Sequence, residues 1–415
     1  MSRIQKEEIK KLFPNLKGNG ELDYVCGWYK KAIDYIANTD IQCCFVSTNS
    51  ICQGNSVITF WRYLIEKSNV QINFAYKSFI WDSEATDKAK VHCVIIGFSR
   101  INNVKNKYLF NNLGEVQKCK YINPYLSTFE LFFIESRNKP LCKVSEMRFG
   151  SMPRDGGNLI ITSEEKDEFI KRNPLSIKWI KSYIGAVEML NNKQRYCLWL
   201  VDTDPAELVK CPDVMDRIKK VKYFRESSKA EGTRKYAKSP HLFCQIAQPD
   251  SDYIMLPKTS SGKRKYLPLD FKTKDTIASD LVFLIPDAGL LEFGILMSNI
   301  HNIWMRTVAG RLKSDYRYSK DIVYNNFPWC QLTDESKANI EDTANKILKA
   351  RQLYPNNSLS EMYGENMYLY SELVKAHNEN DKAVMKAYGF KRSMSDDEII
   401  TELMKMYQNL ITKNQ

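Results

Sequence analysis

The sequence predicts a fold of several domains, in which an α/β region and an α+β region precede an α-helical carboxy-terminal region. The chain has 415 residues, which is too long for one ordinary hydrophobic core. Strand-like apolar runs alternate with helical patterns before residue 100, whereas helical periodicity alone continues after Asp334. These observations predict three domains, over residues 1–122, 123–332 and 333–415.

The first region has the pattern of the second half of a doubly wound α/β sheet. Helical spacing of apolar residues predicts helices over 5–12, 23–36 and 57–65. Apolar runs predict strands over 42–46, 70–75 and 91–98, and the first run suits a strand that is covered on both faces. Residues 100–124 are expected to form a connector. The leading strand–helix units of such a sheet are missing, so we expect the chain to begin within a domain.

The middle and carboxy-terminal regions differ in their patterns. Apolar runs rich in strand-forming residues predict strands over 159–161 and 195–201, and the charged segment 219–235 is expected to be a helix or a loop. From Asp334 onward, apolar residues recur at helical spacing. This pattern predicts an α-helical carboxy-terminal domain.

The charge balance favours a polyanionic partner. The chain has 61 Lys and Arg against 49 Asp and Glu, a net charge of +12, and its isoelectric point is near 9.0. No apolar run reaches membrane-spanning length, and the amino-terminal residues lack an apolar signal region. We therefore expect a cytoplasmic protein without a membrane partner.

Common catalytic and metal-binding motifs are absent from the sequence. It has no G-x-S-x-G, H-E-x-x-H or P-loop motif. The 11 cysteines are scattered without a C-x-x-C pair and the four histidines lack metal-ligand spacing, so we expect reduced core cysteines and no metal site. Asp155 followed by Glu164-Glu165-Lys166 imitates the spacing of a metal-dependent nuclease, but this triplet is more simply a solvated turn.

A segment of mixed arginines and aromatic residues is the strongest local signal for nucleic-acid binding. Arg306, Arg311 and Arg317 interleave with aromatic residues between Trp304 and Trp329. Guanidinium groups neutralise phosphates and pair with guanine edges, aromatic rings stack on unpaired bases, and hydroxyl groups bond to phosphate. An amphipathic helix with a solvated basic face, followed by a buried aromatic loop, explains the same residues and stays open.

Two turn-rich segments are further candidates. In Pro153–Gly157, the glycines Gly156 and Gly157 allow the backbone to approach a phosphate or base, and Arg154 supplies charge. In the hairpin-like segment 259–268, Lys263 and Arg264 lie among three consecutive cations that suit a DNA groove. A plain tight turn and a solvated basic turn are the respective alternatives.

Taken together, several blocks of this sequence resemble one family. The blocks are Leu22–Tyr29, Phe45–Gly54, Val91–Phe98, Ser151–Gly157, Arg195–Leu200, Phe293–Leu296 with His301 and Trp304, Gly310–Leu312, Tyr316–Ser319, Asn325–Trp329 and Ala376–Val384. Their number and order resemble the carboxy-terminal part of MmeI-like class I S-adenosylmethionine-dependent DNA methyltransferases, which belong to restriction–modification systems. The resemblance covers essentially the whole chain.

The resemblance implies a fold and a function. It implies the carboxy-terminal half of a Rossmann-like methyltransferase sheet, a mixed α/β target-recognition domain and an α-helical carboxy-terminal domain. It also implies methylation of adenine N6 within a short site in double-stranded DNA.

On this basis we expect specific residues to contact the DNA. The candidate phosphate or base contacts are Arg154, Gly156, Gly157, Lys263, Arg264, Arg306, Arg311 and Arg317. Tyr318 and Ser319 are expected to position the DNA backbone. Asn49, Ser50 and Trp81 are expected to border the pocket for the extruded base.

The sequence lacks the two motifs that bind the cofactor and carry out catalysis in this family. The family's F-x-G-x-G cofactor loop is absent, and so is its catalytic Asn-Pro-Pro-Phe/Tyr tetrapeptide, since the chain has no two adjacent prolines. No catalytic residue is therefore assigned. The complete enzyme is expected to use S-adenosylmethionine, while this chain alone binds none and is inactive without a missing amino-terminal half.

A second interpretation stays open beside this one. The chain is then a non-enzymatic DNA-binding or specificity module derived from such an enzyme. An RNA-binding protein is a weaker third possibility, because no RNP-like or KH-like signature is present.

Overall fold

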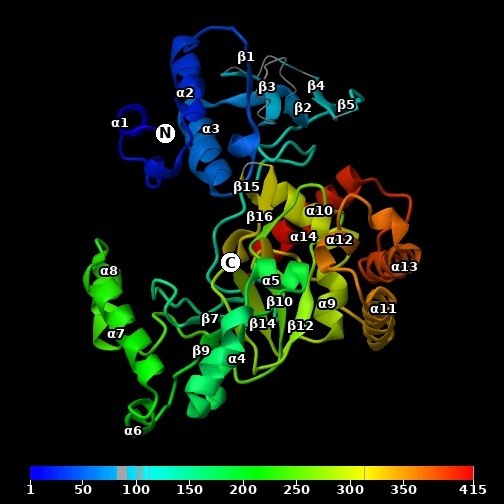
Figure 1. Ribbon diagram of the computed structural model, residues 1–415. Coiled ribbons are helices and arrows are strands. Elements are labelled where there is room, and N and C mark those ends of the chain that lie inside the picture. Colours follow the sequence, from blue (N-terminus) through cyan, green and yellow to red (C-terminus); the bar gives the residue numbers. More distant parts are fainter. Residues whose placement is uncertain (82–90, 101–103, 105, 112, 313, 415) are drawn as a thin grey trace.

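The computed structural model describes residues 1–81, 91–100, 104, 106–111, 113–312 and 314–414 (Figure 1). The first region contains a mixed five-stranded sheet in the order β1-β3-β2-β4-β5. Its strands are β1 (Cys43–Thr48), β2 (Gln71–Trp81), β3 (Val91–Ser99), β4 (Lys107–Phe110) and β5 (Val116–Cys119). β3 is antiparallel to both β1 and β2, so β1 and β2 run in the same direction and end at the same edge.

Helices cover one face of this sheet through an aromatic cluster. The helical segments are α1 (Arg3–Leu12), α2 (Val25–Tyr35), a π-helical turn (Val57–Trp61) and α3 (Arg62–Ser68). The fully buried Tyr29 of α2 contacts the rings of Phe45, Phe98 and Trp61, at centroid distances of 5.1, 5.1 and 5.9 Å. Edge-to-face and offset ring contacts of this kind add to the burial of apolar area. The three helices and three strands predicted for this region are confirmed.

Two predictions for this region are wrong. Within the predicted connector 100–124, β4 pairs in parallel with β2, and β5 pairs with β4. Short strands of this kind are specified by pairing with a distant strand rather than by local apolar pattern. The strand predicted over 42–46 is also not covered on both faces, since Cys44 and Val46, which share one face of β1, are exposed.

The middle region is built from three small sheets. One has the order β12-β10-β14-β6, the second β13-β8-β9-β7 and the third β11-β16-β15. The strands are β6 (Arg148–Phe149), β7 (Ile160–Thr162), β8 (Ile180–Ile184), β9 (Arg195–Leu198), β10 (Tyr253–Pro257), β11 (Thr259–Ser260), β12 (Asp270–Lys272), β13 (Ile277–Ala278), β14 (Val282–Pro286), β15 (Gly310–Leu312) and β16 (Asp315–Arg317). The strands predicted near 159–161 and 195–201 are confirmed as β7 and β9.

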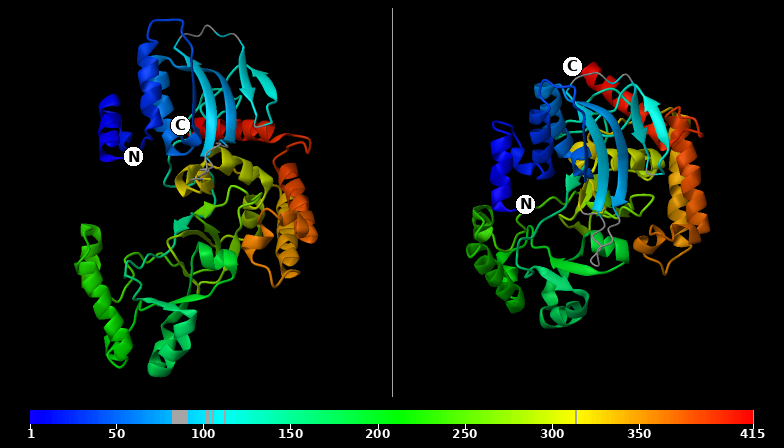
Figure 2. Two further views of the ribbon diagram at one scale, coloured as in Figure 1. Left: turned by 45° about the horizontal axis from the view of Figure 1, so that its top comes forward. Right: turned by 90° about the horizontal axis from the view of Figure 1, so that it is seen from above.

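Helices of the middle region include a projecting arm. The arm contains α6 (Pro205–Leu208), α7 (Pro212–Glu226) and α8 (Glu231–Arg234), and it extends away from the rest of the molecule in Figure 1 and in the left view of Figure 2. The predicted charged helix or loop over 219–235 falls within it. The other helices are α4 (Ser163–Arg172), α5 (Ala186–Asn191), α9 (Leu290–Leu296) and α10 (Asn299–Val308).

The carboxy-terminal region is helical, as predicted. It contains α11 (Asp334–Gln352), α12 (Leu359–Met362), α13 (Ser371–Ala387) and α14 (Asp396–Asn414). Its helices share one hydrophobic core with α9 and α10, and the buried Trp304 of α10 lies 5.9 Å from the Tyr407 ring of α14. Among the residues that the structure describes, no helix has the length and apolar character needed to cross a bilayer.

Close packing between α9, α11 and α13 requires a glycine at position 294. A Cβ at Gly294 would lie 2.7 Å from Cγ2 of Ile340 and 3.2 Å from Cβ of Ala344. Beside it, the buried Asn380 donates from Nδ2 to the carbonyl oxygen of Gly294 at 2.8 Å. A methyl group therefore cannot enter without moving a helix.

We predict that Gly294→Ala destabilises the protein by roughly 1 to 3 kcal/mol, because the overpacked methyl outweighs the better helix propensity of alanine. The matched control is Gly232→Ala in α8, where no atom lies within 4 Å of the added Cβ. There we expect no loss, or a gain of up to about 1 kcal/mol. Urea unfolding of both variants measures this. Equal stability of the two variants would contradict the packing argument.

Candidate nucleic-acid interface

The carboxyl ends of β1 and β2 form a polar edge of the first sheet. Asn49 follows β1 directly, is buried, and donates from Nδ2 to Oγ of Ser78 on β2 at 3.0 Å. The hydroxyl of Ser50 bonds to that of Thr48 at 3.1 Å. In α/β sheets, ligands bind beyond the carboxyl ends of the strands, so this edge is where a site is expected.

A close backbone contact brings the middle region onto this edge. The amide of Gly54 donates to the carbonyl oxygen of Val308 at 3.0 Å, and Gln53 donates from Nε2 to the carbonyl oxygen of Arg306 at 3.4 Å. Gly54 has a φ of 62°, and a Cβ there would lie 3.2 Å from Cα of Gly310. Glycine is needed at position 54 for both reasons. The end of α10 and the start of β15 are thereby fixed beside the sheet.

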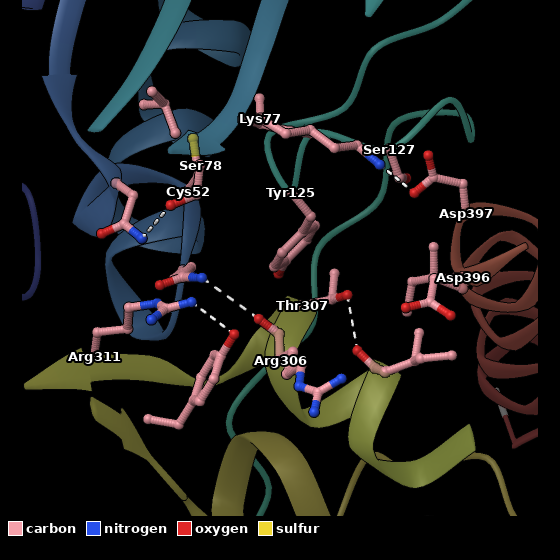
Figure 3. A pocket seen from close by; sticks show the side chains of 17 residues that line it. Cys52, Lys77, Ser78, Tyr125, Ser127, Arg306, Thr307, Arg311, Asp396 and Asp397 are labelled. Atoms are coloured by element: carbon pink, nitrogen blue, oxygen red, sulfur yellow. Dashed lines mark hydrogen bonds and ion pairs between the residues drawn. The ribbon is translucent and has the colours of Figure 1, made fainter. Parts of the chain in front are cut away.

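A polar cavity of about 330 Å³ lies at this junction (Figure 3). Its wall includes Asn49 and Lys77 from the first region, Arg306 and Arg311 from the middle region, and Asp397 from α14. Lys77 forms an ion pair with Asp397, which connects the sheet to the carboxy-terminal helix. The structure therefore brings together residues that the sequence analysis assigned to two separate sites, the base pocket and the DNA-contacting arginines.

Two residues predicted for the base pocket lie near the same edge but not on the wall of this cavity. Ser50 is next to Asn49 and is half-buried. Trp81 ends β2, is 47% exposed, and its ring lies 6.3 Å from that of Phe79.

Arg311 is held rigidly at the cavity. It donates from Nη2 to the hydroxyl of Tyr316 at 2.6 Å and from Nη1 to the carbonyl oxygen of Ser314 at 2.9 Å. Its guanidinium carbon lies 4.0 Å from the centroid of the Tyr316 ring. Burial lowers the pKa of Arg311, while the polar contacts with Tyr316 raise it. Partial desolvation of a cation strengthens its attraction to an anion.

The basic loop between β11 and Tyr266 is braced from two sides. Arg306 donates from Nη2 to the carbonyl oxygen of Arg264 at 3.1 Å and also to that of Lys265. Lys263 pairs with Glu365 at 2.5 Å. The half-buried Arg264 donates from Nη2 to the hydroxyl of Ser360 at 3.2 Å, and burial lowers its pKa. The carboxy-terminal domain thus holds two side chains that the sequence analysis expected to be solvated or DNA-bound.

The remaining residues of the arginine–aromatic segment divide between surface and core. Arg317 is exposed on β16, and Ser319 is half-buried and accepts a bond from the amide of Ile322. Tyr318 is only 3% exposed, and its hydroxyl bonds to Nε2 of His301 at 3.0 Å. Burial also lowers the pKa of His301 to about 3. Tyr318 therefore lies in the core, and the expected DNA contact does not fit its position.

The alternative interpretation of this segment, a helix with a solvated basic face followed by a buried aromatic loop, is right about the loop and wrong about the helix. The aromatic loop is buried, as Tyr324 and Phe327 show. The expected solvated basic face of the preceding helix is absent, because α10 is buried along Ile300–Met305 and Arg306 is itself half-buried.

A buried arginine hydrogen-bonds to the backbone of the turn at Pro153–Gly157. Arg225 of α7 is fully buried and uses all five of its N–H groups. The acceptors are the carbonyl oxygens of Pro153, Arg154, Tyr236, Ser239 and Leu242, at 2.7 to 3.0 Å. The backbone of the turn is thereby tied to the arm.

Arg154, Gly156 and Gly157 themselves are exposed in this turn, and their φ angles are 43°, 64° and 83°. The Arg154 side chain reaches the arm, where Nη1 donates to the hydroxyl of Thr233 at 3.2 Å. The turn therefore presents glycine backbone and one guanidinium group beside the arm.

The nuclease-like residues have structural roles. Asp155 is buried and accepts bonds from the amides of Gly157 and Leu159, at 3.0 and 2.5 Å. Glu165 lies in the first turn of α4 and pairs with Arg217 at 2.8 Å, so the triplet at 164–166 belongs to a helix rather than to a solvated turn. Across the described ranges of the chain, no group of three His, Cys, Asp or Glu side chains is placed to hold a metal ion.

The sequence analysis missed Gln53, Gly54, Lys77 and Arg225. Arg225 had a detectable signal, because it continues the helical spacing of the buried residues Val214, Ile218 and Val221. Gly54 lies just after the 3-10 turn Asn49–Cys52 that follows β1, and a glycine outside regular structure allows close backbone approach. The pairing of Lys77 with Asp397 joins residues far apart in sequence and has no local signal.

Comparisons with known proteins agree with this architecture. Residues 1–111 match the model described as the DNA-methyltransferase domain of MmeI, residues 129–331 match its target recognition domain, and residues 332–414 match its C-terminal domain. The chain is 38% identical over 410 residues to DNA methyltransferase A of Bacillus subtilis (strain 168), a match that covers 99% of the chain and 46% of that protein.

A solved structure gives the same result. The fold matches that of the Type IIL restriction-modification enzyme MmeI in complex with DNA, with a TM-score of 0.89 and 42% sequence identity. This match covers 99% of the chain and 55% of that protein, so the chain spans about half the length of the relatives it matches. The resemblance inferred from the sequence blocks is confirmed. The chain belongs to the MmeI family, and it carries sequence of that family's DNA-methyltransferase, target recognition and C-terminal domains.

Proposed function

We propose that this chain binds and recognises double-stranded DNA for a restriction–modification methyltransferase that transfers a methyl group from S-adenosylmethionine to adenine N6. The supporting observation is the junction at Gly54, which places Arg306 and Arg311 beside Asn49 at the carboxyl edge of the sheet. A target adenine extruded from the helix then lies next to the residues that hold the surrounding phosphates. In this proposal residues 1–122 border the reaction site, 123–332 recognise the DNA, and 333–415 brace the recognition residues.

Different residues have different tasks in this proposal. Phosphate contacts fix the position of the DNA, whereas contacts with base edges select the sequence. Arg154, Gly156, Gly157, Arg317 and Ser319 are assigned to the DNA backbone. Lys263 and Arg264 are assigned to base edges, which requires that DNA replace their partners Glu365 and Ser360. Asn49, Ser50 and Trp81 border the pocket for the extruded adenine.

The described residues do not form a cradle for S-adenosylmethionine. Nucleotide-type cofactors bind where a glycine-rich turn follows a parallel strand and the chain then enters a helix. The turn after β1 is Asn49–Cys52, which has no glycine, and the cavity beside it is bordered by Lys77, Arg306 and Arg311. We therefore assign cofactor binding and catalysis to another polypeptide segment.

The edge of β1 fits such a segment. β1 pairs with β3 alone among the described residues, so its other edge has unpaired backbone N–H and C=O groups. Exposed apolar side chains lie on this strand and just before it, including Val46 and Ile41. Unpaired edges of this kind accept an added strand. We propose that an amino-terminal half of the methyltransferase, bearing the cofactor loop and the catalytic tetrapeptide, pairs there.

We predict that the chain alone binds a 30-base-pair duplex, and that the logarithm of its affinity falls linearly with the logarithm of salt concentration. The slope is expected to be about −0.9 for each phosphate that the arginines and lysines neutralise. Fluorescence anisotropy between about 50 and 200 mM salt measures this. Single-stranded DNA of the same sequence is the control and is expected to bind more weakly. Absence of duplex binding, or equal binding of the single strand, would contradict the proposal.

The proposal also requires the turn at Arg154 to be held in place by Arg225. We predict that Arg225→Met costs roughly 3 kcal/mol or more of unfolding free energy, because five backbone carbonyl oxygens lose a buried, charged donor. The matched control is Arg234→Met on the exposed surface of α8, for which we expect a change within about 0.5 kcal/mol. Urea unfolding measures both variants. A cost for Arg225→Met no larger than that for the control would show that the turn does not depend on this residue.

A further inference from the structure

We propose that the arm contacts the phosphate backbone of duplex DNA, through a basic and aromatic surface made by Lys219, Lys220 and Tyr223 on α7. This surface is separate from the cavity at Gly54 and from the braced loop at Lys263. The inference rests on the proposed function, since it adds a second contact with the same DNA.

The pattern of α7 separates a buried face from a solvent face. Val214, Ile218, Val221 and Arg225 are buried against the rest of the middle region. Lys219, Lys220 and Tyr223 lie on the exposed side, and Tyr223 is 74% exposed. A large aromatic side chain that is held out into solvent between lysines contributes no stability to the core, but its hydroxyl is suited to bond a phosphate oxygen.

The arm is strongly basic. Between Pro212 and Lys238, Lys and Arg occupy nine positions while Asp and Glu occupy four. Lys220 pairs with Asp216 at 2.7 Å, but exposed pairs one helical turn apart are weak and exchange readily for another anion. The ion pairs described for this part of the chain do not include Lys219.

The arm and the turn at Pro153–Gly157 form one surface. Lys219, Lys220 and Tyr223 line a shallow concavity together with Asn158, which follows Gly157 directly. The ring of Phe224 lies against Gly156, where a Cβ would meet it at 2.8 Å. Arg225 donates to the carbonyl oxygens of Pro153 and Arg154, which ties the turn to the arm. The lysines of α7 are therefore rigidly placed beside a turn already assigned to the DNA backbone.

The position of the arm also fits a long double helix. In Figure 1 and in the left view of Figure 2, the arm and α1 lie on the same side of the molecule, at opposite ends of an open face. A duplex bound at the Gly54 junction and extending along that face passes the arm. Lysine is depleted in the centres of protein–protein interfaces and enriched at phosphate contacts, so the charge of this surface favours DNA over a protein partner.

The test compares two charge-reversal variants of the full chain. Lys219→Glu with Lys220→Glu alters the proposed surface. Lys375→Glu with Lys382→Glu makes the same change of charge on the exposed face of α13, on the far side of the molecule from the arm. Anisotropy of a 30-base-pair duplex over a range of salt concentrations measures both, and circular dichroism shows whether each variant is folded. A third variant, Lys219→Ala with Lys220→Ala, removes the charges while favouring the helix.

We expect the arm reversal to weaken duplex binding by roughly tenfold or more and to reduce the salt slope by about 1.8, the value for two phosphate contacts. The alanine variant should reduce the slope by the same amount, and the α13 reversal should change affinity less than about twofold. If the parent binds the duplex and both arm variants keep the salt slope of the parent, this inference is wrong and the proposed function is unaffected. Failure of the parent to bind duplex would overturn both. Normal DNA binding with lost pairing to an amino-terminal half would assign the arm to a protein partner instead.

Discussion

The backbone contact between Gly54 and Gly310 is the constraint on which the proposed site depends. Neither domain contains the cavity alone, because Asn49 and Lys77 come from the first sheet while Arg306 and Arg311 come from the middle region. The hydrogen bond from Gly54 to Val308 fixes the distance between them, and the φ of 62° at Gly54 permits that approach. A Cβ at Gly54 would lie 3.2 Å from Cα of Gly310 and would strain the backbone, whereas a Cβ at Gly310 would be in ordinary contact with Gly54 at 3.9 Å. The glycine at position 54 thus permits the approach that brings the candidate side chains of two domains together.

The carboxy-terminal domain contacts the basic loop between β11 and Tyr266 as well as the cavity. Ser360 and Glu365 bind Arg264 and Lys263, and the buried Arg351 of α11 donates to the carbonyl oxygen of Leu269 at 2.8 Å, just beyond that loop. The half-buried Arg264 and the buried Arg351 are strongly oriented, since a buried cation without a partner is costly, whereas the exposed pair of Lys263 with Glu365 contributes little. Ordering the loop before DNA arrives lowers the entropic cost of binding. A helical domain that contributes few candidate DNA contacts is therefore suited to control the recognition residues.

Much of the fold was predictable from local pattern, and much of the site was not. Apolar spacing in α2 and in the runs that became β2 and β3 identified those elements, because their burial repeats with the period of the structure. The pattern failed for β4 and β5, which are short and depend on pairing with β2. For the site, Arg306, Arg311 and Asn49 were singled out by residue type. Their meeting in one cavity, and the burial of Tyr318 against His301, depend on tertiary contacts without a periodic signal.

The most direct test of the account is methyl transfer from labelled S-adenosylmethionine to a duplex that contains the recognised site. The chain alone, an amino-terminal methyltransferase half alone, and their mixture are assayed separately. We predict transfer to adenine N6 only in the mixture, with the choice of site set by this chain. Transfer by the chain alone would contradict the proposal that another polypeptide segment supplies cofactor binding and catalysis. A mixture that assembles and binds the site but never transfers a methyl group would instead favour a specificity module without an enzymatic role.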